Sequence, residues 1–117
     1  MSQKALHGIK VLDLSENLPG PYTALILAGL GAEVTKVERP GGDPAKRLPN
    51  LYNVLNRGKN VVVADLKSDV GLAQVQNLIV ESDVVIESFR PGTLRKLGVD
   101  FSTLMVAYPQ KIFVSIS

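Results

Sequence analysis

Short apolar stretches rich in β-branched residues alternate along the chain with longer stretches whose apolar residues recur at helical spacing. The short stretches predict five strands, at residues 8–15, 32–38, 60–66, 83–88 and 111–117, of which the first reads as buried. The stretches between them predict helices at about 20–31, 49–55 and 69–80, and two short helices within 90–98 and 100–109. Prolines and glycines crowd residues 39–50, which therefore read as a loop.

Capping residues support these boundaries. Gly31 is expected to end the first helix, Ser68 or Asp69 to cap the helix that follows the third strand, and Asp100 to cap the last one. Strands that alternate with helices imply right-handed crossovers between parallel strands. The pattern predicts one α/β domain over residues 1–117, with a Rossmann-like, doubly wound and mainly parallel sheet.

In such a sheet, ligands bind beyond the carboxyl ends of the strands. The loops at those ends start at Ser15, Glu38, Asp65 and Glu87. Two groups of basic residues follow these points. Each residue taken alone could belong to a solvated loop, but both groups fall at or just after the expected ligand-binding edge. Their members are Arg39, Lys46, Arg47, Arg57, Lys59 and Lys67 in the first group, and Arg90, Arg95 and Lys96 in the second.

Composition narrows the class of protein. The 117 residues are 45% apolar and 21% charged, as in ordinary globular domains. There is no cysteine for a disulfide or a thiolate metal site, and no metal site is expected. The apolar run at residues 24–28 is too short to cross a membrane, and the first residues lack a secretory signal. A net charge of +2 does not indicate nucleic-acid binding. We expect a cytoplasmic protein, or a mitochondrial or peroxisomal matrix protein in a eukaryote.

The stretch "KVERPGG" at residues 36–42 contains two residues that could each bind a different ligand at this edge. Glu38 could bind a ribose hydroxyl of NAD(P), and Arg39 could bind a phosphate. A dinucleotide site needs a glycine-rich first turn, but "SENLPGP" has one glycine, followed by Pro21, which has no amide hydrogen. No P-loop sequence occurs either. Many cationic side chains without a glycine cradle suit a ligand with several phosphates, such as coenzyme A (CoA).

The order of the motifs extends this reading. "GIKVLDLSENLPGPYTALILAGLGAEVTKVERPGGD", "NRGKNVVVADLK", "SDVVIESFRPGTLRKLG" and "PQKIFVSIS" follow one another from Gly8 to Ser117. In this order they resemble the family III CoA-transferases (CaiB/BaiF), which include the α-methylacyl-CoA racemases. The resemblance implies an acyl-CoA substrate, no prosthetic group and an interlaced homodimer for a full-length member.

The resemblance also implies where CoA binds. Arg39 matches an arginine that contacts the CoA nucleotide, although a salt bridge to Glu38 or Asp43 is the alternative. If Arg39 binds the phosphate, Glu38 is expected to orient it. The loop along the adenosine matches Ala64, Asp65, Leu66 and Lys67, where Lys67 would bind a phosphate and Asp65 could instead cap the following helix.

The remaining positions implied by the resemblance lie in three other segments. Ser88, Phe89 and Arg90 match the loop after the fourth strand, and Phe89 would pack beside adenine or pantetheine, or else in the core. Lys96 stands where relatives usually have arginine, so it should bind a phosphate less tightly than an arginine would. Asn17 and Leu18 lie where the thioester would arrive.

Two reactions stay open. Many transferases have glutamine where this chain has Leu18, which favours racemase-like removal and return of the α-proton of a 2-methylacyl-CoA. The alternative is CoA transfer between carboxylic acids through an aspartyl-CoA thioester. His7, the sole histidine, is expected to be a surface or packing residue. The family's catalytic residues are expected beyond Ser117, so we expect a fragment of a longer enzyme that binds CoA without catalysis. A non-catalytic CoA-binding module is the third alternative.

Overall fold

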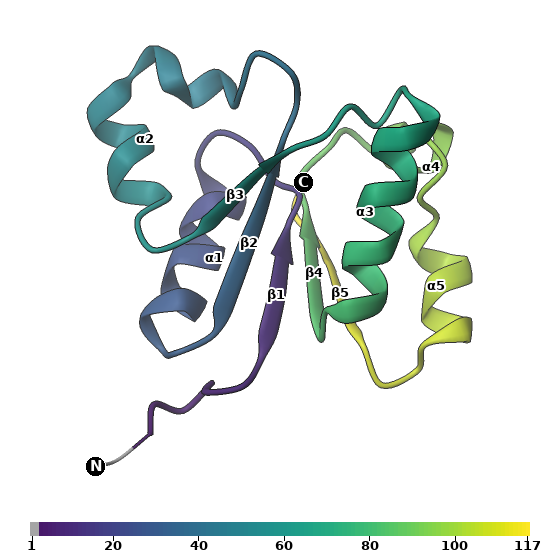
Figure 1. Cartoon of the computed structure of the whole chain (residues 1–117), viewed down its shortest axis with the longest axis horizontal. Helices are drawn as coiled ribbons and strands as arrows, with labels where there is room; N and C mark the ends of the chain where they lie inside the picture. Colours follow the sequence, from purple (N-terminus) through teal and green to yellow (C-terminus); the bar gives the residue numbers. More distant parts are fainter. Residues whose placement is uncertain (1–2) are drawn as a thin grey trace.

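Five parallel strands form a single sheet that is covered by helices on both faces (Figure 1). The structure, a computed structural model, describes residues 3–117. The predicted α/β Rossmann-like fold is confirmed, with strand order β3-β2-β1-β4-β5. The strands are β1 (Lys10–Asp13), β2 (Glu33–Glu38), β3 (Asn60–Val63), β4 (Val84–Glu87) and β5 (Ile112–Ser115).

The predicted helices are present, and one more turn of helix was missed. Within the segment predicted as a loop, Asp43 accepts a hydrogen bond from the backbone amide of Ala45 and so starts a short 3-10 helix. Ser68 and Asp100 cap their helices as expected, through the backbone amides of Gly71 and Ser102. The helices are α1 (Pro19–Gly29), η1 (Pro44–Arg47), α2 (Pro49–Leu55), α3 (Asp69–Glu81), α4 (Thr93–Lys96) and α5 (Phe101–Ala107).

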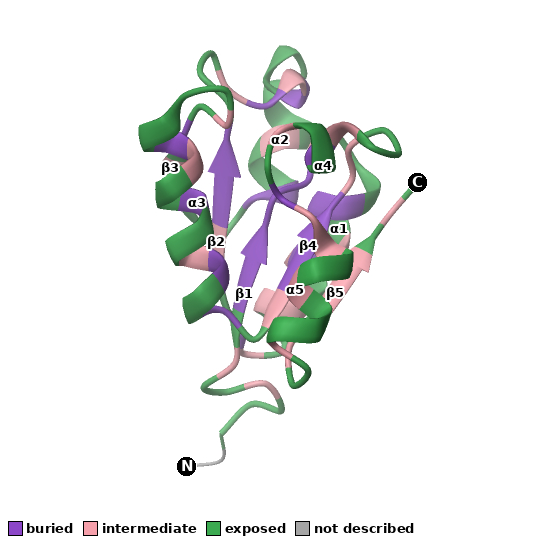
Figure 2. Cartoon of the chain, turned by 90° about the vertical axis from the view of Figure 1, so that its right-hand side faces the viewer, coloured by how far each residue is buried: buried purple, intermediate pink, exposed green. Residues whose placement is uncertain are grey.

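Alternation along the central strands divides the core into two layers. Leu12 of β1 faces Val75 and Ile79 of α3, and this layer continues to α4 and α5. Val11, its neighbour in β1, faces the opposite way and packs with Ala24 of α1. Figure 2 shows β1, β2 and β4 mostly buried between helices whose outer surfaces are exposed, whereas the edge strands β3 and β5 contain no buried residue. All five strands end at the same edge of the sheet, which is the upper edge in Figure 1.

Two helices begin so close to this edge that only glycine fits at the point of contact. A side chain at Gly71, in the first turn of α3, would collide with the backbone of Asp65. A side chain at Gly20, in the first turn of α1, would collide with Ser15. Neither glycine has a positive φ, so the requirement is one of space and not of backbone conformation. The loops that follow β1 and β3 are therefore pressed directly against helix starts.

We predict that Gly71→Ala lowers the free energy of unfolding by about 1–3 kcal/mol, because the new methyl group forces the backbone of Asp65 to shift. The matched control is Gly29→Ala at the end of α1, where a methyl group would meet no atom within 4 Å. That change should be neutral or stabilise the fold by about 0.5–1 kcal/mol. Urea unfolding of both variants measures the difference, and equal effects would contradict this explanation.

Candidate functional site

A pocket of about 470 Å³ opens at the carboxyl edge, on the face of the sheet that α3 and α4 cover. Six of the ten residues predicted to bind CoA line it, although they come from three separate loops. These six are Arg39, Ala64, Asp65, Leu66, Lys67 and Phe89, and the other lining residues are Leu14, Glu16, Val37, Pro40, Thr93 and Leu97. The pocket thus combines an apolar lining with charged groups, an arrangement common in small-molecule sites.

The backbone after β3 turns sharply to bring Lys67 to the pocket. The amide of Ala64 still donates to the carbonyl of Glu38 at 3.0 Å, as in a continuing strand. The carboxylate of Asp65 then accepts a hydrogen bond from the amide of Lys67 at 2.9 Å, and the chain enters α3 through the Ser68 cap. Asp65 therefore shapes the loop, and Ser68 caps the helix.

Arg39 is paired with Glu16, a residue that sequence reasoning did not select. The guanidinium Nε donates to Glu16 Oε2 at 2.6 Å, and Nη2 donates to Oε1, so the contact is bidentate. These hydrogen bonds to Glu16 raise the pKa of Arg39 above its ordinary value. The alternative that Arg39 forms a salt bridge to Glu38 or Asp43 is wrong, because its partner is Glu16. Glu16 carries no local sequence signal, because its partner lies 23 residues away.

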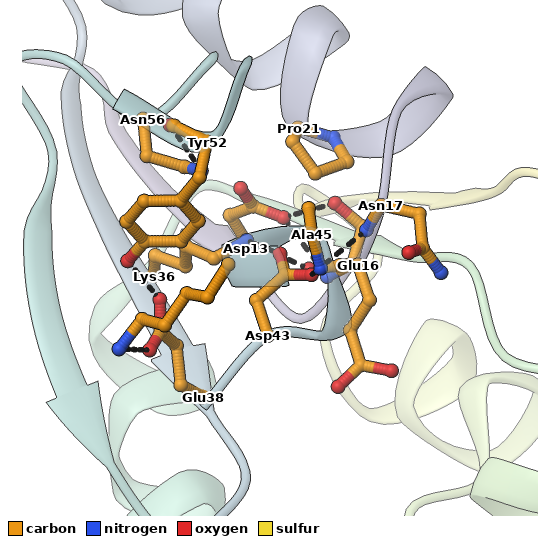
Figure 3. Close-up of polar contacts among 12 residues, drawn as sticks. Asp13, Glu16, Asn17, Pro21, Lys36, Glu38, Asp43, Ala45, Tyr52 and Asn56 are labelled. Atoms are coloured by element: carbon orange, nitrogen blue, oxygen red, sulfur yellow. Dashed lines mark hydrogen bonds and ion pairs between the residues drawn. The ribbon is translucent and has the colours of Figure 1, made fainter. Parts of the chain in front are cut away.

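Glu38 lies on the opposite face of the sheet from the pocket, and the idea that it orients Arg39 is wrong as well. Its carboxylate is buried, accepts a hydrogen bond from the Tyr52 hydroxyl and lies 3.0 Å from Lys46 Nζ (Figure 3). Burial and the hydrogen bond to Glu38 raise the pKa of Tyr52. Neighbouring side chains in a strand point to opposite faces, which separates Val37 in the pocket from Glu38.

Beneath α1 and α2, two fully buried lysines hold the loops of the edge together. Lys36 Nζ donates to Asp43 Oδ2 at 2.7 Å and to the carbonyl of Ser15 at 3.1 Å. The other carboxylate oxygen of Asp43 accepts the amide of Asn17 at 3.1 Å, linking the loops that follow β1 and β2 (Figure 3). Burial alone would raise the pKa of Asp43, but hydrogen bonds from Lys36 and from the amides of Ala45 and Asn17 outweigh it and lower that pKa.

The second buried lysine, Lys59, ties the start of β3 to the start of α1. Its Nζ donates at 2.9 Å to each of three oxygens, which belong to Asp13, Pro21 and Asn56. Burial lowers the pKa of Lys59, against the attraction of Asp13. Lys46 and Lys59 belong to the basic group of the sequence analysis, but their positive charges serve internal ion pairs on the far side of the sheet.

The other four predicted residues lie outside the pocket. Ser88 accepts a hydrogen bond from the amide of Glu16 at 3.0 Å, so it supports the loop after β1. Arg90 lines a neighbouring pocket of about 260 Å³, which shares Phe89 with the first. Lys96 is exposed and lines neither of these two pockets. Asn17 is also exposed, and its backbone has a left-handed φ of 69°.

Phe89 fits both interpretations that the sequence left open, since it lines the pocket and also packs against the buried core.

Two cations and two carboxylates line this pocket, namely Arg39, Lys67, Glu16 and Asp65. Among residues 3–117, Lys67 has no ion-pair partner within 4.0 Å, whereas Arg39 is paired with Glu16 through Nε and Nη2. A site with exposed cations at its rim and apolar walls can bind an anionic ligand that also has an apolar part.

Comparison with known proteins identifies the family. The protein-family model described as CoA-transferase family III matches residues 6–117 of this chain. The chain belongs to this family. The CoA-transferase/lyase DddD of a Marinomonas species is 42% identical, over 97% of this chain and 13% of its own length. The succinate–glutarate CoA-transferase of Agrobacterium fabrum is 41% identical, over 96% of this chain and 32% of its own length.

Solved structures of the family have the same fold. A CAIB/BAIF family protein from Brucella suis matches with a TM-score of 0.93 and 37% identity, over 99% of this chain and 34% of its own. The hypothetical protein Rv3272 from Mycobacterium tuberculosis matches with a TM-score of 0.87 and 41% identity, over 96% of this chain and 33% of its own. This family III chain therefore spans about a third, or less, of the length of these relatives.

Two further properties concern residues 3–117 only. No helix in this range combines the length and the apolar character needed to cross a bilayer. Within the same range, histidines, aspartates and glutamates form no group of three or more that could hold a metal ion. The ionisable groups of this part of the family III chain are instead arranged as ion pairs and around the pocket.

We predict that Asp43→Asn lowers the free energy of unfolding at pH 7 by about 3–5 kcal/mol, because Lys36 stays buried without its counter-charge. The pKa of Asp43 is lower in the folded than in the unfolded chain, so the unfolded chain takes up the proton first as the pH falls. The wild type should lose this stabilisation from about pH 5 downward, as the pH passes the unfolded pKa of about 3.9 and then the folded one.

The variant should therefore show a shallower loss of stability below about pH 5, measured by urea unfolding across pH. Asp100→Asn is the control, because Asp100 caps α5 and asparagine caps almost as well; hydrogen bonds from Ser102 also lower the pKa of Asp100, so this variant removes an acid of lowered pKa that has no buried counter-charge. It should change stability little at pH 7. A wild-type pH profile that Asp43→Asn leaves unchanged would show that the buried pair does not have this role.

Proposed function

We propose that this chain forms the CoA-binding part of a CoA-transferase, with the CoA nucleotide in the pocket between Arg39 and Lys67. The observation that carries the proposal is the meeting of six predicted residues from three loops in one pocket of about 470 Å³. Membership of CoA-transferase family III implies CoA thioester substrates, which supports the choice of ligand.

The chemistry of the lining suits the parts of CoA. Arg39 offers a planar fork that can bind a phosphate through two hydrogen bonds, and Lys67 offers a compact charge on a flexible stem. The adenine or the pantetheine arm would pack on apolar residues such as Leu14, Val37 and Phe89. Arg90, in the neighbouring pocket, would reach a phosphate that extends beyond the first pocket.

The proposed reaction is transfer of CoA between carboxylic acids, and not the racemase-like proton transfer that the sequence favoured. The relatives compared above include proteins named as CoA-transferases, one of them for succinate and glutarate. The racemase reading depended mainly on Leu18 in place of a polar residue. Leu18 is the exposed N-cap residue of α1, about half exposed, so its apolar character does not define a buried reaction centre.

The carboxylates near the pocket are already engaged in structural contacts. Glu16 is paired with Arg39, and Asp65 accepts the Lys67 amide. The buried Asp13 and Asp43 are held by Lys59 and Lys36 on the far face of the sheet. A transferase needs an available carboxylate nucleophile. We therefore propose that residues 1–117 bind CoA, and that a nucleophile from outside this segment completes the reaction.

We predict that Arg39→Ala and Lys67→Ala each weaken CoA binding by about 10- to 100-fold, since a hydrogen bond to a charged group contributes roughly 1.5–3 kcal/mol. Isothermal titration calorimetry of the purified chain measures the dissociation constants. Lys10→Ala is the matched control, because Lys10 is exposed at the opposite, amino end of β1. The same loss in the control, or no loss at Arg39, would argue against this pocket as the CoA site.

We also predict that the chain alone shows no turnover when it is mixed with succinyl-CoA and glutarate, or with a 2-methylacyl-CoA in deuterated water. Chromatography detects glutaryl-CoA, and mass spectrometry detects deuterium at the α-carbon. Formation of glutaryl-CoA would mean that residues 1–117 already contain a nucleophile. Deuterium at the α-carbon without CoA transfer would revive the racemase interpretation.

A further inference from the structure

The two cations of the pocket, Arg39 and Lys67, differ in their ion pairing. Lys67 has no ion-pair partner within 4.0 Å among residues 3–117, while Arg39 is held by Glu16 through both Nε and Nη2. This edge of the guanidinium is one that a phosphate or a carboxylate can bind with two parallel hydrogen bonds. An anionic ligand that uses it must therefore take the place of the Glu16 carboxylate.

Such an exchange needs little rearrangement. The amide of Glu16 donates to Ser88, and the neighbouring Asn17 amide donates to buried Asp43, so the backbone of this loop is fixed on both sides. The Arg39 side chain is 56% exposed and the Glu16 side chain 15% exposed, so when the pair opens the guanidinium moves into water while the Glu16 carboxylate stays at the loop. Exposed ion pairs contribute only about 0.2–1 kcal/mol to stability. The pair can open while the loop keeps its shape.

Competition with a tethered carboxylate discriminates between anions. Because Glu16 is attached beside Arg39, its effective concentration there is high, and a free carboxylate of similar basicity cannot displace it efficiently. A phosphate group carries more charge and more acceptor oxygens, so it gains more from the guanidinium and Lys67 together. A CoA-transferase works in the presence of free carboxylic acids, which would otherwise compete with CoA for an open arginine.

We propose that Glu16 is a specificity-determining residue, which occupies Arg39 until a phosphate displaces it and so keeps free carboxylates out of the nucleotide pocket. The proposal rests on the CoA site proposed above, and adds a role for a residue that has no part in binding CoA directly. It also explains why a pocket proposed for a polyanion carries a carboxylate next to its arginine.

The first test compares two changes that each remove one negative charge from the pocket lining. Glu16→Gln should tighten CoA binding about two- to fivefold, the gain expected when a weak ion pair no longer has to be broken. Asp65→Asn should change the affinity less than twofold, because Asp65 does not contact Arg39. In an Arg39→Ala background, Glu16→Gln should have no such effect, which a double-mutant cycle measures. Equal gains from Glu16→Gln and Asp65→Asn, or a gain that persists without Arg39, would overturn the proposal.

The second test does not depend on CoA. The NMR signal of the Arg39 Nε–H group, assigned by its loss in Arg39→Ala, is followed while succinate or pyrophosphate is added. Pyrophosphate should shift the signal in the wild type, whereas millimolar succinate should shift it only in Glu16→Gln. This result would support the role of Glu16 even if CoA bound to no variant and the proposed function failed. A wild-type signal that responds to succinate as strongly as Glu16→Gln, or to neither anion in either protein, would overturn the role of Glu16 whatever CoA does.

Discussion

The ion pair between Lys36 and Asp43 connects the loops that follow β1 and β2 at the ligand-binding edge. Both side chains are fully buried, which is costly for charged groups unless each is well hydrogen-bonded. Here the lysine also binds the Ser15 carbonyl, and the aspartate also binds the amides of Asn17 and Ala45. One buried pair thereby fixes the loop after β1, the loop after β2 and the start of η1 relative to one another. The backbone from which Glu16 and Arg39 extend is set by this contact.

The sheet separates two groups of charges with different roles. On the face under α1 and α2, the side chains of Lys36 and Lys59 are fully buried and link the loops and helix starts at this edge through ion pairs and hydrogen bonds. At the pocket on the other face, Arg39 and Lys67 are exposed and can respond to a ligand. Buried pairs are rigid because leaving either partner alone is expensive, whereas exposed pairs exchange readily. The same residue types therefore give a stiff scaffold on one side and an adaptable site on the other.

The fold and much of the pocket followed from local sequence patterns, because strand periodicity and helix caps involve residues close together in the chain. Arg39 and Lys67 could be placed at one edge, since parallel strands end there, and the resemblance to family III added Ala64, Asp65 and Leu66 to the site. Partners could not be assigned in the same way. Arg39 finds Glu16 across 23 positions, and Lys59 finds Asp13 across 46, and no pattern specifies such pairs. The sequence already favoured Arg39 over Glu38, because the first turn lacks the glycines of a dinucleotide site, but it did not show that Glu38 faces the opposite side of the sheet and pairs with Tyr52 and Lys46.

The tight contacts at Gly20 and Gly71 have a consequence for how this site can change over time. Because both helix starts lie directly against the preceding loops, insertions or bulkier residues there would disturb the sheet itself. New ligand preferences are more accessible through the exposed side chains that project from a fixed backbone, such as those at positions 16, 39 and 67. The architecture thus confines evolutionary variation to a few side chains, and single substitutions can alter what the pocket accepts without redesigning the fold.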